Sequence, residues 1–287
     1  MAYLTKGVNM ERILTIQDIS CVGKCSLTVA LPIISACSVE CSVLPTAVLS
    51  THTAFKGFTF RDLTDDITPI YKHWKAENIG FDAIYTGYLG SFKQLDLVKE
   101  IIDNFKTENN FVLIDPVMAD NGNLYTGFDQ KFAFAMAELC KNADIVVPNL
   151  TEASFMLNIP YVADGYTEDY IKDILVKLTD LGCKTAILTG INFSNGKLGV
   201  YGYNRAKNRY FSYFNTHLPK SFHGTGDVFA SALCGALARG KDIEHALKIA
   251  VDFTVESIKN TIKNNDANWY GVEFEKAIPQ LVNDINN

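Results

Sequence analysis

The sequence of 287 residues lacks several features that would each assign the chain to a particular class of protein. It has no run near the roughly 18 apolar residues that a membrane-spanning helix needs. Its first residues, MAYLTKGVNMERILTIQD, contain no apolar core of signal-peptide length. No cluster of lysine and arginine stands out and the formal net charge is −6, so the basic surface typical of nucleic-acid binding is missing. We therefore expect a cytoplasmic protein that binds neither nucleic acid nor membrane.

Cysteine is present, but it gives no sign of a disulfide framework. The seven cysteines are an odd number spread along the chain, and without an export signal we expect reduced thiols. Cys21 and Cys25 are four residues apart, as are Cys37 and Cys41. Zinc sites usually have more closely spaced pairs with supporting histidines. We interpret these cysteines as small core residues.

The chain also lacks internal repeats, low-complexity segments and linkers rich in proline, glycine and serine. Its composition, 48% hydrophobic and 20% charged, is that of an ordinary globular protein. We therefore predict a single domain over residues 1–287, in which residues 1–10 form a flexible N-terminal extension.

Short apolar runs that alternate with helical patterns predict an α/β fold. Strands are predicted at 12–17, 41–50, 82–90, 111–117, 144–149 and 184–190. Helices are predicted at 24–37 (interrupted by Pro32), 91–105 (with Ser91 as N-cap), 128–141, 167–182, 226–239, 242–262 (with Asp242 as N-cap) and about 271–285. This order indicates a Rossmann-like, mostly parallel central sheet with helices on both faces. The alternating segments KLGVYGYN and NRYFSYF predict an antiparallel hairpin at one edge.

The segment HGTGDVFASALCGALARG, residues 223–240, joins a glycine turn to a helix. Backbone N–H groups converge at such a turn, and the helix dipole adds positive potential that favours a phosphate. Asp227 would repel that phosphate, so its presence needs a reason. It could be the general base for a hydroxyl that attacks the phosphorus. Alternatively, the turn is an ordinary one before a core helix, and Asp227 only complements the helix dipole.

Two other phosphate-binding motifs do not match. The loop Gly-x-x-x-x-Gly-Lys-Ser/Thr is absent, and Phe229 stands where a dinucleotide-binding motif needs a glycine. Polar segments follow the predicted strands instead: IQDIS, LSTHT, YTGYLG, DPVMAD, VPNLTE and LTG. Ligands of parallel α/β sheets bind at the carboxyl ends of the strands, so we expect one shared site there.

In these segments the chain resembles the ribokinase superfamily and, within it, the pyridoxal/pyridoxamine kinases. The GTGD of the superfamily is matched at 224–227 and its N-x-x-E at 149–152. The vitamin-kinase branch is matched by THT at 51–53, TGYLGS at 86–91 and DPVMAD at 115–120. The resemblance implies transfer of the γ-phosphoryl group of ATP to the 5′-hydroxymethyl group of a B6 vitamer (pyridoxal, pyridoxamine or pyridoxine). It also implies Mg²⁺, often a monovalent cation (K⁺ or Na⁺), and a homodimer.

The resemblance further implies a role for each matching residue. Asp227 is the base, and the N–H groups of Gly224, Thr225 and Gly226 hold the transferring phosphoryl group. The metal ion and its waters lie at Asp115, Asn149 and Glu152, whose oxygens suit Mg²⁺. The nucleotide contacts Asp120, Tyr125, Asn149, Thr189, Thr225 and, near the adenine, Phe222. The pyridine pocket is lined by Asp18, Val22, His52, Thr53 and Tyr88. Tyr88 can stack on a pyridine ring and Asp18 can bond its nitrogen or hydroxyl.

Several of these residues also have a purely structural interpretation. Asp115 could simply end a strand, and Asn149 and Glu152 could cap a helix that starts near Thr151. His52 and Tyr88 could belong to the core.

Three departures from the family pattern concern the substrate. Many pyridoxal kinases carry Ser where Asp18 stands, Asn where Thr51 stands and Gly where Ala54 stands. Asp18 is also what the related hydroxymethylpyrimidine kinases carry, so a hydroxymethylpyrimidine kinase of thiamin biosynthesis is the alternative. A non-catalytic nucleotide- or vitamer-binding sensor is a second alternative. The presence of Asp227, Asn149 and Glu152 argues against a sensor.

Overall fold

The structure is a computed structural model that describes residues 10–193, 196–220 and 222–287. Of the N-terminal extension expected over residues 1–10, only Met10 lies within the described residues. None of the described helices combines the length and the apolar content needed to cross a membrane.

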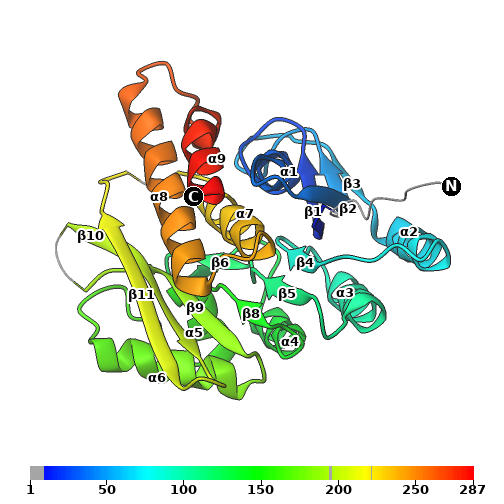
Figure 1. The fold of residues 1–287 in the computed structure, drawn as a ribbon, viewed down its shortest axis with the longest axis horizontal. Coiled ribbons are helices and arrows are strands. Elements are labelled where there is room, and N and C mark those ends of the chain that lie inside the picture. Colours follow the sequence, from blue (N-terminus) through cyan, green and yellow to red (C-terminus); the bar gives the residue numbers. More distant parts are fainter. Residues whose placement is uncertain (1–9, 194–195, 221) are drawn as a thin grey trace, which may run out of the picture.

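The described residues form a nine-stranded sheet, shown in Figure 1, with the order β11-β10-β9-β8-β5-β4-β1-β2-β3. The central strands run parallel: β1 (Arg12–Ser20), β2 (Glu40–Leu49), β4 (Ala83–Thr86), β5 (Phe111–Ile114), β8 (Ile145–Val146) and β9 (Thr185–Ile191). The predicted hairpin, β10 (Lys197–Asn204) with β11 (Arg209–Thr216), is antiparallel and completes one edge. This confirms the predicted fold class.

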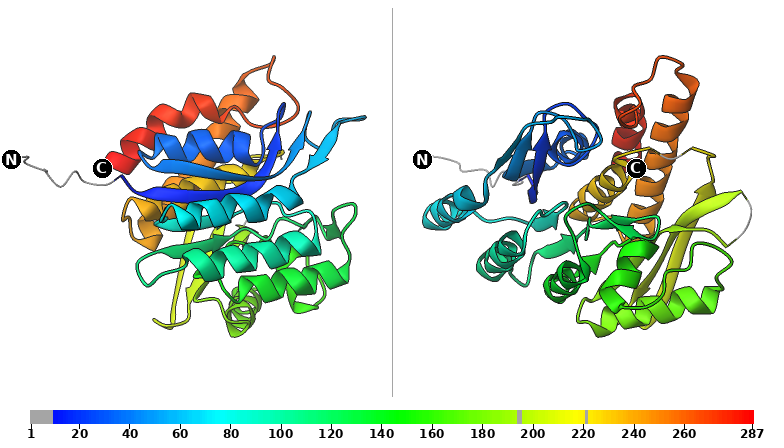
Figure 2. Two further views of the ribbon diagram at one scale, coloured as in Figure 1. Left: turned by 90° about the vertical axis from the view of Figure 1, so that its right-hand side faces the viewer. Right: turned by 180° about the vertical axis from the view of Figure 1, so that it is seen from behind.

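Helices cover both faces of the sheet (Figures 1 and 2). One hydrophobic core lies under α2 (Thr64–Ala76), α3 (Phe92–Phe105), α4 (Gln130–Cys140), α5 (Leu150–Leu157) and α6 (Glu168–Asp180). The second core lies under α1 (Leu27–Ala36), α7 (Thr225–Ala238), α8 (Ile243–Lys263), the 3₁₀ turn η1 (Phe274–Ala277) and α9 (Ile278–Asn286). The strands between the two cores are buried on both sides, which explains their continuous apolar sequences.

Short polar side chains begin several of these helices by accepting a hydrogen bond from a backbone N–H group three residues on. Ser91 does so from Gln94 at 3.2 Å, and Asp242 from His245 at 2.9 Å. Both N-caps agree with the prediction from sequence. Pro32 lies inside α1, which continues through it instead of being interrupted.

Some elements differ from the sequence prediction. Helix α2 and the antiparallel edge strand β3 (Phe60–Asp62) were not predicted. The predicted strand at 82–90 ends at Thr86, and the last predicted helix begins as the 3₁₀ turn at Phe274. A small separate hairpin is formed by β6 (Ala119–Asp120) and β7 (Asn123–Leu124). The cysteines are unpaired thiols, but Cys21 is exposed, so its interpretation as a core residue was wrong.

The strand order reverses at β1, which pairs with β2 on one side and with β4 on the other. Ligand sites of open α/β sheets form at such a reversal, beyond the carboxyl ends of the strands. Asp18 lies near the carboxyl end of β1, while Tyr88 and Asp115 follow β4 and β5. The fold therefore brings these predicted site residues together at the carboxyl ends of the parallel strands.

Candidate active site

A cavity of about 390 Å³ opens at the carboxyl ends of the central strands, beside the start of α7. Its walls come from the loops after β5, β8 and β11, from β9 and β10, and from α8. All residues predicted for phosphoryl transfer, nucleotide and metal line it: Asp115, Asp120, Tyr125, Asn149, Glu152, Thr189, Phe222, Gly224, Thr225, Gly226 and Asp227. The structure thus gathers these three predicted sets into one space.

The glycine turn before α7 depends on its first glycine. Gly224 has φ of +77°, a left-handed conformation that favours glycine. A Cβ atom at Gly224 would lie 1.6 Å from the carbonyl oxygen of Lys24. Among the described residues no side chain caps α7, so the first N–H groups of the helix stay available at the cavity. A Cβ atom at Gly226 would meet no other described residue within 4 Å, so that position borders open space in the described part of the chain.

Asp227, in the first turn of α7, accepts a hydrogen bond from Ser26, the residue before α1. The backbone N–H of Ser26 donates to Oδ2 of Asp227 at 3.0 Å, and the Ser26 hydroxyl donates to Oδ1 of Asp18 at 2.6 Å. Ser26 adopts a positive φ of 53° to make both contacts. Burial raises the pKa of Asp227 to about 7; the Ser26 N–H opposes the shift and Asp18 adds to it. A carboxylate with a pKa near 7 suits a general base.

Asp115 and Glu152 form a buried acidic pair beside this base. Burial raises the pKa of Asp115 well above its usual range, and the charges of Glu152 and Asp227 raise it further. Burial also raises the pKa of Glu152 to about 8. The hydrogen bonds that Glu152 accepts from backbone N–H groups act in the opposite direction and lower its pKa. Within the described residues, no hydrogen bond reaches the carboxylate of Asp115. Such mutually repelling acids are stabilised by a cation.

Glu152 and Asn149 also form the capping box of α5. Oε2 of Glu152 accepts from the backbone N–H of Asn149 at 2.9 Å, and Oδ1 of Asn149 accepts from that of Glu152 at 2.9 Å. Oε1 of Glu152 accepts from Met118 N–H at 3.2 Å. The cap interpretation of these two residues is therefore confirmed, and their role toward a metal stays a prediction.

The donor set fits Mg²⁺ better than a metal held by protein alone. Over residues 10–193, 196–220 and 222–287, no group of three His, Cys, Asp or Glu side chains is placed to hold a metal ion. Mg²⁺ usually takes one or two carboxylates and completes its shell with phosphates and water. Asp115 is the side chain best placed for such a contact, because its buried carboxylate faces the cavity without a hydrogen bond.

The cavity also contains residues that the sequence did not single out. Lys220, His217 and His223 add donors from the segment before the glycine turn. Lys220 Nζ lies over the ring of Phe222 at 4.9 Å. An apolar wall suited to a flat base is formed by Leu198, Leu218, Val251, Val255 and Ile258. The α8 residues were indistinguishable from core in the helical pattern, because the same stripe packs on the sheet and borders the cavity.

The residues predicted to line the pyridine pocket lie apart from the walls of this cavity. Asp18 is buried on β1, and Tyr88 contacts Phe128 with ring centroids 5.7 Å apart. The backbone N–H of His52 donates to the carbonyl of Val22 at 3.1 Å, which joins these two loops. Val22 and Thr53 are exposed. Ser26 is hydrogen-bonded to both Asp18 and Asp227. The residues predicted for the pyridine pocket therefore adjoin the residues predicted for phosphoryl transfer.

Comparisons with known proteins agree with this geometry. The sequence profile described as phosphomethylpyrimidine kinase matches residues 34–270. A candidate phosphomethylpyrimidine kinase from Bacteroides thetaiotaomicron, crystallised with pyridoxal, is 40% identical, with a TM-score of 0.90 over 95% of this chain and 96% of that chain. Pyridoxal kinase from Lactobacillus plantarum is 28% identical, with a TM-score of 0.87 over 95% and 97%. Hydroxymethylpyrimidine/phosphomethylpyrimidine kinase from Aquifex aeolicus is 27% identical over 65% of this chain and 71% of its own.

Proposed function

Because the chain belongs to the phosphomethylpyrimidine kinase family, we propose that it transfers the γ-phosphoryl group of ATP to the 5′-hydroxymethyl group of a B6 vitamer. The observation that carries the proposal is the joint position of Asp227 and the open N–H groups at Gly224–Gly226. The likeness to a protein crystallised with pyridoxal and to a pyridoxal kinase supports the choice of a B6 vitamer.

The chain's own residues supply positioning and a base. The N–H groups at the start of α7 bind the transferring phosphoryl group and stabilise its charge. Asp227 accepts the proton of the substrate hydroxyl as the oxygen attacks phosphorus. Its carboxylate is oriented by the Ser26 N–H, and with its pKa at about 7 it is about half ionised at pH 7 and largely ionised above that pH. The apolar wall on α8 and β10 binds the adenine, beside Phe222.

Asp115, with Asn149 and Glu152 next to it, would hold Mg²⁺, which neutralises phosphate charge when bound. Asp18 binds the polar edge of the heteroaromatic substrate ring, and Tyr88 lies against its face. Burial and the nearby Asp18 raise the pKa of Tyr88, so it stays a neutral ring. A monovalent cation, a homodimer, the single-domain organisation and a cytoplasmic location stay predictions.

A hydroxymethylpyrimidine kinase is the second candidate function. Asp18 and the likeness to the Aquifex aeolicus enzyme favour it. The pyrimidine substrate is also a flat heteroaromatic ring with a hydroxymethyl group, so the same base and N–H groups would serve.

One assay separates the two functions. Purified protein with ATP and Mg²⁺ is offered pyridoxal, pyridoxamine, pyridoxine and hydroxymethylpyrimidine in parallel, and ADP release is measured. We expect a higher kcat/KM for at least one vitamer than for the pyrimidine. A clear preference for the pyrimidine would reject the vitamer and retain the kinase.

A further inference from the structure

The segment from Asn264 to Ala277 lies between α8 and α9 and packs against the loop that contains His52 and Phe55; we refer to it as the strap. None of its residues matches a motif of the family resemblance. Its turn brings Trp269 and Tyr270 against the loop that contains His52. The strap is thus the segment that closes the group of residues predicted to bind the substrate ring.

Aromatic rings from three parts of the chain meet at this turn. The ring of Trp269 lies 4.6 Å from that of Phe55 and 5.8 Å from that of His52, measured between centroids. The ring of His223, which precedes Gly224, lies 5.4 Å from that of His52. A heteroaromatic ring bound among these residues would therefore lie next to the turn that binds the phosphoryl group.

His52 offers a hydrogen-bond donor to such a ring. The backbone N–H of Ala54 donates to Nδ1 of His52 at 3.1 Å, so in the neutral ring the proton is on Nε2. Nε2 is buried and makes no hydrogen bond of good geometry among the described residues; a weaker hydrogen bond with the backbone of Tyr270 acts to raise the pKa of His52. Burial, followed by His223, lowers the pKa of His52. A buried donor with only a weakly placed acceptor is costly, and a polar atom of a ligand would satisfy it better.

Trp269 is 59% exposed, whereas two of the rings that it contacts, His52 and Phe55, are buried and half-buried. One part of its indole packs on Phe55 while the rest stays open, so it can accept a second flat ring. An exposed tryptophan next to a buried donor is the combination that binds a heteroaromatic ligand: one face to stack on and one polar atom to orient it.

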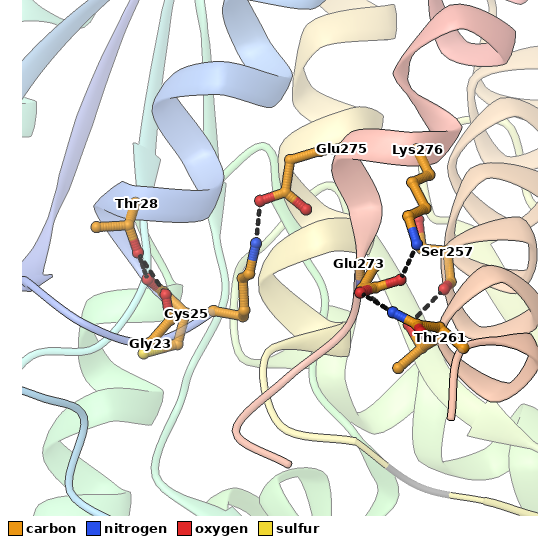
Figure 3. Close-up of polar contacts among 10 residues, drawn as sticks. Gly23, Cys25, Thr28, Ser257, Thr261, Glu273, Glu275 and Lys276 are labelled. Carbon is orange, nitrogen blue, oxygen red and sulfur yellow. Dashed lines mark hydrogen bonds and ion pairs between the residues drawn. The ribbon is translucent and has the colours of Figure 1, made fainter. Parts of the chain in front are cut away.

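Polar contacts join the C-terminal part of the strap to α8 and to the loop before α1. The backbone N–H of Glu273 donates to Thr261 Oγ1 at 2.8 Å, and Lys276 pairs with the Glu273 carboxylate at 2.6 Å. Figure 3 shows Glu275 facing the loop that contains Gly23 and Cys25, where it pairs with Lys24. Lys24 Nζ also lies over the ring of Phe274 at 5.0 Å.

A glycine lets the strap approach the same lysine. A Cβ atom at Gly271 would lie 2.2 Å from the Cβ of Lys24. Lys24 thus contacts Gly271 of the strap with its side chain. It contacts Gly224 with its own backbone carbonyl oxygen. The strap and the phosphoryl-binding turn are therefore positioned against one residue.

We propose that the strap forms the outer wall of the substrate pocket and that Trp269 stacks on the substrate ring as a specificity-determining residue, with the Nε2–H of His52 as the donor that orients it. The proposal rests on the proposed function for the identity of the ring. Trp269 would distinguish between acceptors by the size and electron density of their rings. Asp227 and the N–H groups at the start of α7 would act on all acceptors alike.

Two measurements test the proposal. The chain has two tryptophans, Trp74 and Trp269, so Trp74→Phe leaves Trp269 as the only one. We expect its fluorescence to be quenched saturably by the preferred acceptor without nucleotide. Trp269→Ala should raise KM for that acceptor roughly 3- to 10-fold, as the loss of an aromatic pair does, with KM for ATP unchanged. Trp269→Phe should restore most of the loss. Phe134→Ala, which removes another exposed aromatic residue, is the control and should leave both constants unchanged.

The outcomes separate this proposal from the proposed function. If the enzyme phosphorylates a vitamer or the pyrimidine and Trp269→Ala retains the wild-type KM, the role of the strap is refuted and the function stands. If no acceptor is phosphorylated, the proposed function is refuted. The fluorescence titration with the same four compounds then tests by binding alone whether Trp269 stacks on a ligand ring. Absence of quenching by all four refutes the stacking role.

Discussion

Replacing Asp227 by asparagine tests the centre of the proposed mechanism. Asn has nearly the same size, and its Oδ1 can still accept the N–H of Ser26, which lies 3.0 Å from Asp227. It cannot accept a proton from the substrate hydroxyl. Loss of a general base typically costs about 10²–10⁴ in rate, or roughly 3–5 kcal/mol in barrier height. We expect kcat to fall by this factor while ATP affinity, measured by calorimetry, is retained.

The pKa of Asp227 adds a second readout. With a folded-state pKa of about 7, kcat/KM of the wild type should rise about tenfold per pH unit below pH 7 and level off above it. In the Asp227→Asn variant, kcat/KM should not show this rise with pH. Asp169→Asn is a matched control, since Asp169 lies in the first turn of α6 and is exposed. It should keep the wild-type profile.

Stability should change in the opposite direction from activity. The pKa of Asp227 is raised from 3.8 to about 7 on folding, so stability is lost as pH rises through this window. The cost above pH 7 is at most about 4 kcal/mol, at about 1.4 kcal/mol per pKa unit. Asp227→Asn removes this cost and should raise Tm at pH 8. An acid that only complements the helix dipole predicts normal turnover and a loss of about 0.3–1 kcal/mol. Wild-type kcat together with a lowered Tm would refute the catalytic role.

Two further predictions concern the neighbouring groups. Glu152→Gln should keep the fold, because the amide oxygen can still accept from Asn149, although its NH₂ would face the Met118 N–H and lower Tm. It should also weaken the dependence of activity on Mg²⁺; a Mg²⁺ titration that overlays the wild type would leave Glu152 as a helix cap only. Gly224→Ala should lower Tm and activity together, because its Cβ would lie 1.6 Å from the Lys24 carbonyl oxygen, whereas Gly226→Ala, at an open helical position, should keep Tm and raise KM for ATP. Equal thermal melts for the two alanine variants would contradict the assigned packing.

The sequence predicts the sheet and its helices wherever local pattern and burial agree. Ser91 and Asp242 mark helix starts because N-capping is a short-range interaction. Helix α2, TDDITPIYKHWKA, was missed because Pro69 and its many polar residues obscure a narrow apolar stripe, of which Ile67 and Tyr71 are buried. Strand β3 is too short and exposed to give a pattern, and exists through its pairing with β2.

The site residues that belong to a sequence motif could be predicted. Those that join the site through contacts between distant parts of the chain could not. The residues of GTGD and N-x-x-E were found from their order along the chain, and they line one cavity. The Ser26 bridge between Asp18 and Asp227 left no local signal, because its partners are 8 and 201 residues away. Trp269 was equally hidden, since its contacts with Phe55 and His52 are made across the fold.

The contact of Gly224 with Lys24 also bears on how the enzyme is made. The ion pair of Lys24 with Glu275 and the Ser26–Asp227 bond span 251 and 201 residues. Contacts between such distant residues form late, because long loops must close first. A growing chain therefore has no nucleotide site until α8 has been made, and ATP cannot assist its early folding. ATP should slow unfolding without accelerating refolding, which stopped-flow fluorescence with and without nucleotide would record.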